Sequence, residues 1–185
     1  EFKDVSEQLE ISISPNPVPA GETAEMSFCV KSDRSKWGRN YYWATPVING
    51  KTYRNADNSS RIGIWAITKE IFDNVSDEEK AKAGRPKFEK STYSFGKIKK
   101  GETVHASFTF KNEGKSPFCV YKVNSDAPCW SHSTIPAAQP GEEITFRVHL
   151  DTTGLPAVEH LTIVTLTTNS PLRPIVNLFI AGYIE

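Results

Sequence analysis

Three segments of the chain begin at a turn containing Gly-Glu and then alternate apolar with polar residues at a period of two. They read "GETAEMSFCVK" at 21–31, "GETVHASFTFK" at 101–111 and "PGEEITFRVHLD" at 140–151, and the first two are identical at six of eleven positions. This alternation is typical of a half-buried β-strand. The side chains expected to face the core are Val104, Ala106, Phe108 and Phe110 in the second segment and Phe146, Val148 and Leu150 in the third.

Turn signals between further apolar segments divide residues 86–185 into about six or seven predicted strands, as in an immunoglobulin-like domain. The candidates before Pro86 are "LEISISP", "AEMSFCVKS", "YYWATPVI", "KTYRN" and "RIGIWAIT". Asn49-Gly50 favours a type I′ hairpin between two of them. The pattern therefore predicts an all-β protein made of two tandem immunoglobulin-like β-sandwich domains.

One segment, "SDEEKAKAG", has the signals of a helix. Ser76 can cap its start, Glu79 stands three residues on as in a capping box, and Gly84 can close its end. We therefore expect an N-terminal module at 1–75, a short helical linker at 76–85 and a C-terminal domain at 86–185. The first module is short, so it is either a truncated sandwich or one that depends on packing against the neighbouring domain.

Turn glycines and core aromatics occur in a specific order in the second half of the chain: Phe95-Gly96, Gly101-Glu102, Phe108, Asn112, Gly114, Pro140-Gly141, Asp151, Gly154, Thr168-Asn169 and Gly182. In this order and spacing, residues 87–185 resemble domain-of-unknown-function family 1573, an immunoglobulin-like domain frequent in exported proteins of Bacteroidetes-type bacteria. The resemblance implies a non-enzymatic binding or structural module of a cell-envelope or secreted protein, periplasmic or at the cell surface.

Charge and hydropathy exclude some classes of partner. Lysine plus arginine and aspartate plus glutamate both number 22, so the chain lacks the positive field of a nucleic-acid binder. No apolar run approaches the roughly 20 residues that a transmembrane helix needs. The first residues do not read as a signal peptide, so an export signal or lipid anchor would lie upstream of Glu1.

The three cysteines raise the alternative of a redox or metal-binding module centred on Cys129. Many members of the family carry Cys-x-Cys-Thr, and here Ala127 stands at the first cysteine position and Cys129 at the second. Cys129 and His132 could supply two zinc ligands, but a structural zinc site usually needs four. We therefore expect no metal and no cofactor. A disulfide between Cys119 and Cys129 stays open, because sequence does not reveal connectivity.

The remaining chemistry-bearing residues favour no enzyme. Cys29 is expected to be buried in its alternating strand, and His105 and His149 are expected to be surface histidines on outward strand faces. The sequence contains no Gly-x-Ser-x-Gly elbow, Walker loop, dinucleotide fingerprint or His-Glu-x-x-His helix. We therefore expect no catalytic residues.

The segment "KWGRNYYWATPVINGKTY" is unusually rich in aromatic residues. On a strand Tyr41 and Trp43 share one face and Tyr42 takes the other. The favoured interpretation puts Tyr41 and Trp43 in the core and packs Trp37 over its edge. In the alternative, exposed rings stack on a sugar or anchor a protein. The binding candidates are then Trp37, Arg39 and Tyr42, and the partner is a protein or glycan at the cell envelope.

Overall fold

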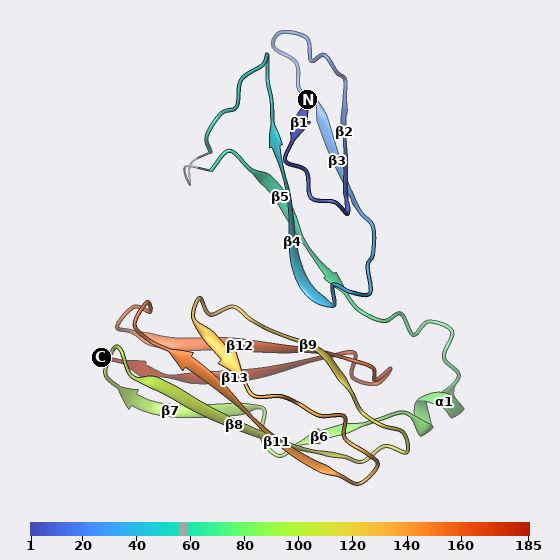
Figure 1. The fold of residues 1–185 in the computed structure, drawn as a ribbon, viewed down its shortest axis with the longest axis vertical. Helices are drawn as coiled ribbons and strands as arrows, with labels where there is room; N and C mark the ends of the chain where they lie inside the picture. Colours follow the sequence, from blue (N-terminus) through green and yellow to red (C-terminus); the bar gives the residue numbers. More distant parts are fainter. Residues whose placement is uncertain (56–58) are drawn as a thin grey trace. The chain divides into compact units, whose positions relative to one another are not determined.

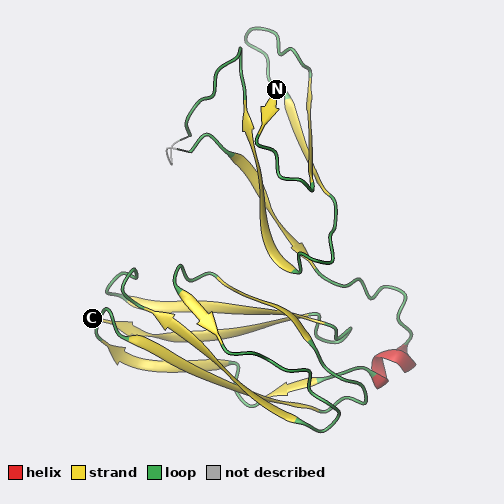
Figure 2. Cartoon of the chain, viewed as in Figure 1, coloured by secondary structure: helices red, strands yellow, loops and turns green. Residues whose placement is uncertain are grey.

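The computed structural model describes residues 1–55 and 59–185, and it divides the chain into two compact units, Glu1–Thr68 and Lys69–Glu185 (Figure 1). Nearly all the regular structure is β-strand, as the sequence predicts (Figure 2). Within the described ranges the helix is α1, Asp77–Lys82. No helix of this part of the chain is long and apolar enough to cross a membrane.

The described residues of unit 1 form five strands: β1 (Phe2–Lys3), β2 (Leu9–Ser14), β3 (Glu25–Val30), β4 (Gly38–Pro46) and β5 (Ile62–Thr68). One sheet has the order β1-β4-β5, and β2 pairs with β3 in a second sheet. The buried side chains of this unit are few, because both sheets are small: Leu9, Tyr42, Ala44 and Thr45.

Unit 2 is a sandwich of two four-stranded sheets, β10-β11-β8-β6 and β7-β13-β12-β9. The strands are β6 (Pro86–Phe88), β7 (Thr92–Ile98), β8 (Thr103–Asn112), β9 (Val120–Ser125), β10 (Trp130–His132), β11 (Glu143–Asp151), β12 (Glu159–Thr168) and β13 (Ile175–Ile184). Consecutive strands β6 and β7 belong to different sheets, and β7 runs parallel to β13. The chain therefore crosses between the sheets at residues 89–91.

The predicted core alternation is confirmed in the central pair β8 and β11. The seven residues predicted to face inward are at most 4% exposed: Val104, Ala106, Phe108, Phe110, Phe146, Val148 and Leu150. Nine consecutive residue pairs join the two strands in antiparallel register. This pair therefore forms the rigid centre of its sheet.

The three Gly-Glu sequences form the same turn. Gly21, Gly101 and Gly141 have φ of 82°, 95° and 80°. In each turn the N–H of the following glutamate donates to the carbonyl oxygen three residues earlier, at 2.9 to 3.1 Å. A positive φ at the third position is what a type II turn requires, and glycine adopts it without steric strain. The sequence repeat is thus a repeated turn and strand.

Local signals from the sequence were mostly correct. The capping box is present, with the Glu79 N–H donating to Ser76 Oγ at 3.2 Å and the Ser76 N–H donating to the Glu79 carboxylate at 2.9 Å. Asn49 and Gly50 both have positive φ, as a type I′ turn requires. The predicted strand 51–55 is wrong, because only an isolated bridge between Ile48 and Lys51 forms.

The role predicted for Gly84 is also wrong. The helix ends at Lys82, and the next residue, Ala83, caps it in an extended conformation without a left-handed glycine. Gly84 instead lies against the chain at 117–118, where a Cβ atom would come within 2.9 Å of the Phe118 Cα. Its carbonyl accepts a 2.6 Å hydrogen bond from the buried Ser170 hydroxyl. Close packing, not helix termination, is the reason for glycine here.

Asn112 is the best-connected buried polar side chain of unit 2. It is fully buried, and its Oδ1 accepts hydrogen bonds from the N–H groups of Arg85 and Gly114, both at 3.0 Å. Its Nδ2 donates to the carbonyls of Ser116 and Ala138, both at 2.9 Å. All four hydrogen-bonding positions of the amide are therefore used. One side chain thus joins the start of β6 to two loops at the end of β8.

We expect Asn112→Ala to lower the free energy of unfolding of unit 2 by about 2–5 kcal/mol, because it leaves buried backbone groups without partners. Urea unfolding followed by circular dichroism measures the change. Asn177→Ala is the matched control, because this exposed amide accepts one hydrogen bond, from Thr165 at 3.0 Å. Equal effects of both substitutions would contradict the role given to Asn112.

We expect Gly141→Ala to destabilise the protein by roughly 1–2 kcal/mol, the cost of placing a side chain in the left-handed region. Gly154→Ala is the control, because its φ lies outside that region and a Cβ atom there meets nothing within 4 Å. It should be neutral or slightly stabilising. Thermal unfolding of both variants compares them, and an unchanged midpoint for Gly141→Ala would refute the strain argument.

Candidate functional site

The outer face of the β4 and β5 pair carries a row of aromatic and arginine side chains. Arg39, Tyr41 and Trp43 occupy alternate positions of β4 and so project from one face of the sheet. The register places Tyr41 opposite Trp65 of β5, and Arg61 directly precedes that strand. We call Arg39, Tyr41, Trp43, Arg61 and Trp65 the aromatic–arginine face.

These five side chains stack in an unbroken order. The Arg39 guanidinium lies 4.4 Å from the centre of the Trp65 ring, and Trp65 lies 5.0 Å from the Tyr41 ring. Tyr41 stacks on Trp43 at 6.1 Å, and Arg61 covers Trp43 at 4.8 Å. Each cation–π contact contributes about 0.5–1 kcal/mol at an exposed site. These contacts favour the stacked arrangement of the row.

Gly63 makes room for this row. It lies opposite Trp43 in the register, and a Cβ atom there would come within 2.9 Å of the Tyr41 ring and hydroxyl. The ring of Tyr41 therefore lies across the bare glycine backbone, a packing that a side chain would prevent. A side chain at this position of "IGIWAIT" would also clash with the backbone carbonyl of Tyr42, so both the backbone and an aromatic ring of the neighbouring strand require the glycine.

The structure reverses the favoured assignment of faces in β4. Tyr42 is the inward residue, 2% exposed, whereas Tyr41 is 37% exposed and Trp43 is half-buried on the outer face. The expectation that Tyr41 and Trp43 fill the core is therefore wrong. Small Ala44 shares the inner face with Tyr42 and is fully buried there. The hydroxyl of Tyr42 has no hydrogen-bond partner among the described residues.

The three predicted binding residues therefore lie in different environments. Arg39 is exposed and belongs to the aromatic–arginine face, Trp37 is half-buried directly before β4, and Tyr42 faces the core. The sequence reasoning missed Trp65, which is 59% exposed. The Gly-x-Trp spacing in "IGIWAIT" could have indicated Trp65, because it puts the glycine and the tryptophan on the same strand face.

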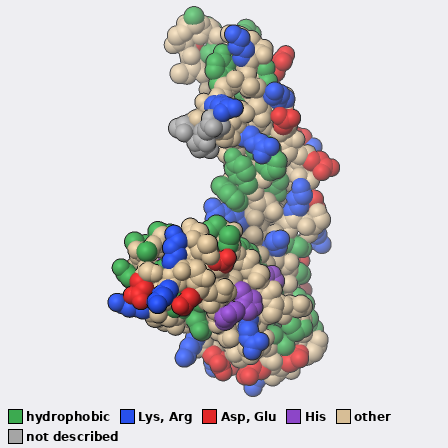
Figure 3. All heavy atoms as spheres, turned by 60° about the vertical axis from the view of Figure 1, so that its left-hand side comes forward, with side chains coloured by type: hydrophobic (Ala, Val, Ile, Leu, Met, Phe, Trp, Pro, Cys, Tyr) green, Lys and Arg blue, Asp and Glu red, His purple; other side chains and the backbone are tan. Residues whose placement is uncertain are grey.

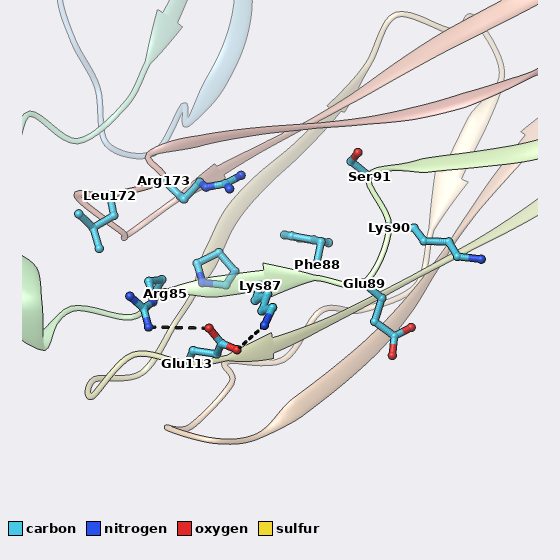
Figure 4. Close-up of a pocket in the computed structure, with 10 residues that line it drawn as sticks. Arg85, Lys87, Phe88, Glu89, Lys90, Ser91, Glu113, Leu172 and Arg173 are labelled. Atoms are coloured by element: carbon cyan, nitrogen blue, oxygen red, sulfur yellow. Dashed lines mark ion pairs between the residues drawn. The ribbon is translucent and has the colours of Figure 1, made fainter.

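Unit 2 has a hollow of about 690 Å³ where the chain crosses from β6 to β7 (Figure 4). Arg85 and Lys87 both point at Glu113, at 3.7 and 3.1 Å, while Arg173 and Lys90 also line the hollow. Its lining contains lysine, arginine and glutamate but neither histidine nor cysteine. The excess of cations gives it an attraction for anions.

All three cysteines are free thiols. The expectation that Cys29 is buried is wrong, because its side chain is exposed. Cys129 is also exposed, and Cys119 is half-buried. Ala127, at the position of the family's first cysteine, packs into the core at 9% exposure. Within residues 1–55 and 59–185, no three side chains of His, Cys, Asp or Glu gather where they could hold a metal ion.

The model of a protein family described as "Protein of unknown function (DUF1573)" matches residues 86–184, more than half of the chain. The chain belongs to this family. The match confirms the resemblance seen in residues 87–185. The DUF1573 chain has no match among curated proteins.

Solved structures resemble the DUF1573 chain in fold. A protein of unknown function from Porphyromonas gingivalis W83 superposes with a TM-score of 0.63 at 15% identity, over 95% of this chain and 84% of that one. The ASH/PapD-like domain 7 of human CEP192 gives 0.47 at 9% identity, over 65% and 96%. The periplasmic chaperone SfaE gives 0.37 at 13% identity, over 55% and 57%. The first likeness shows a bacterial counterpart of the fold.

We expect Gly63→Ala to disrupt the aromatic–arginine face, because the new methyl group would clash with the backbone carbonyl of Tyr42 and with the Tyr41 ring, so that both would have to shift. The near-ultraviolet circular dichroism of the coupled rings should fall, and the free energy of unfolding should drop by about 1–3 kcal/mol, as for other overpacked sites. Gly154→Ala serves again as the control. An unaltered near-ultraviolet spectrum would show that the rings do not depend on Gly63.

Proposed function

We propose that the chain is a non-enzymatic binding module of an exported bacterial protein, and that it binds a protein partner through the aromatic–arginine face. In this proposal it consists of tandem immunoglobulin-like domains at 1–75 and 86–185 with a short helical linker at 76–85. The division of the chain after Thr68 and the capped helix Asp77–Lys82 support this organisation.

The observation that carries the proposal is the concentration of tryptophan, tyrosine and arginine on one exposed face. These residue types dominate the binding energy of protein interfaces, since they offer large contact areas and directed donors. Trp65 is 59% exposed, and Ile67, the next outward residue of β5, is 56% exposed. Leaving such side chains in water is unfavourable, and a partner that covers them removes this apolar surface from water.

The position of the face in the sheet favours a protein over a glycan. β5 is the last strand in the order β1-β4-β5, so its outer backbone edge can pair with an extended segment of a partner. An arginine guanidinium already covers each terminal ring of the stacked row: Arg39 lies over Trp65, and Arg61 lies over Trp43. The ring faces that a sugar would stack on are thus partly covered. The guanidinium groups present fixed donors for carboxylates or carbonyls.

Family membership supports the export and the absence of catalysis. The chain resembles domains that are frequent in exported proteins of Bacteroidetes-type bacteria, and no enzymatic activity is associated with them. The alternative of a redox or metal-binding module rests on Cys129, whose expected partner position is occupied by the buried Ala127. Cys129 is a free, exposed thiol, and a thiol that forms no disulfide is not one half of a dithiol couple.

The test is site-specific photo-crosslinking with the full chain in the envelope fraction of the source bacterium. A photoreactive amino acid in place of Ile67 should give a crosslinked product of discrete mass, and Arg39→Ala together with Trp65→Ala should abolish it. The same group in place of Tyr183, which is 42% exposed in unit 2, is the matched control. Tyr42→Phe should leave the product unchanged, because its side chain faces the core.

Four outcomes would count against the proposal. A product that survives the double substitution, or one that forms equally from position 183, places the contact elsewhere. A glycan array that loses binding with the double variant, without any protein crosslink, makes the occupant of the face a carbohydrate. Activity that requires the Cys129 thiol and ignores Arg39 and Trp65 favours the redox alternative.

A further inference from the structure

His105 and His149 form a directly opposed pair across the two central strands of unit 2. His105 lies in β8 and His149 in β11, and the antiparallel register makes them partners. Directly opposed residues have Cβ atoms about 4.5–5.5 Å apart, close enough for imidazole rings to meet. The sequence placed each histidine on an outward face but did not show that they share a row.

The two imidazole rings converge on one point. The Nδ1 atoms are 2.6 Å apart, and the rings meet edge to face with centres 4.8 Å apart. For this contact to be a hydrogen bond, one Nδ1 must carry a proton and donate it as N–H to the lone pair of the other. When both Nδ1 atoms are unprotonated, both lone pairs point toward the same region of space above the sheet.

The spacing fits a metal ion that replaces the shared proton. Metal–nitrogen distances of 2.0–2.1 Å put two imidazole ligands about 2.9 Å apart at a right angle and about 3.4 Å apart in a tetrahedron. The observed 2.6 Å is short of these values by less than an ångström. A small rotation of the exposed His105 ring about its side-chain bonds can supply the difference.

The scaffold keeps the pair in place without the metal. Their strand neighbours Val104, Ala106, Val148 and Leu150 are all at most 4% exposed and anchor both strands in the core. Ser131 of β10 lies on the other side of His149 in the register, and the His149 ring is half-buried. Ligands held by packed strands lose little freedom on binding, which favours affinity.

We propose that His105 and His149 form a two-histidine chelating site for a divalent transition metal of the Cu²⁺, Ni²⁺ or Zn²⁺ class. Imidazole nitrogen suits these ions, and Cu²⁺ should bind most tightly. Because no third ligand of the described chain joins the pair, water or a donor from another molecule completes the coordination. All four histidines lie in unit 2, where histidine side chains are exposed at the surface (Figure 3).

The test is calorimetric titration of the full, chelator-treated chain with Ni²⁺, Zn²⁺ and Cu²⁺ chlorides at near-neutral pH. We expect saturable binding of one ion per chain, weakened at least about tenfold by His105→Ala or His149→Ala, since even outer-shell changes cost 10–100-fold in affinity. His132→Ala and His160→Ala are the matched controls and should bind as the unchanged chain does. Acidification should weaken binding, because protons compete for the same lone pairs.

A second measurement does not depend on the folding of any variant. Substoichiometric Cu²⁺ should broaden the imidazole proton signals of two histidines before those of the other two in the unchanged chain. No saturable binding, or binding that survives both alanine substitutions, overturns the proposal. Binding that is lost on Cys129→Ser but kept without the histidine pair overturns it in favour of a site at the thiol.

Discussion

Successive side chains of a strand point to opposite faces, so burying one face of a paired strand decides what the other face presents. In β8 and β11 the buried row includes Val104 and Leu150, and the same register brings His105 and His149 together on the outside. In β4 the buried residue is Tyr42, which turns Tyr41 and Trp43 outward onto Trp65. The choice of buried residues in each unit therefore determines both the histidine pair and the aromatic–arginine face.

Short polar side chains fix the loops between the strands by hydrogen bonds to their backbone groups. The Asn112 amide joins the start of β6 to the ends of two loops, and the Ser170 hydroxyl bonds the carbonyl of Gly84 at 2.6 Å. Thr152 does the same at the β8 turn, accepting from the Gly101 N–H at 2.9 Å and donating to the Glu102 carbonyl at 2.7 Å. Buried backbone groups in such loops need partners, and a side chain that supplies them fixes the loop.

The two units differ in how they use their surfaces. Unit 2 has the larger core and the family match, and the paired histidines His105 and His149 lie on the outer face of its central strands. Unit 1 has few buried residues, yet it presents Trp65 and Ile67 at more than half exposure. Aromatic surface that the unit's own core does not use is better suited to recognition than to stability.

The sequence by itself determined the elements whose causes are local. Period-two alternation predicted the inward residues of β8 and β11, the glycines predicted the turns, and Ser76 with Glu79 predicted the helix start, because each depends on residues a few positions apart. Three features depended on contacts between distant segments: the face of Tyr42, the packing of Gly84 against Phe118, and the meeting of His105 with His149. Alternation in β4 fits either face, since both carry aromatic residues, and only the neighbouring strand with Gly63 and Trp65 selects one. Register between strands is a property of the folded chain, and it is the register that built both sites.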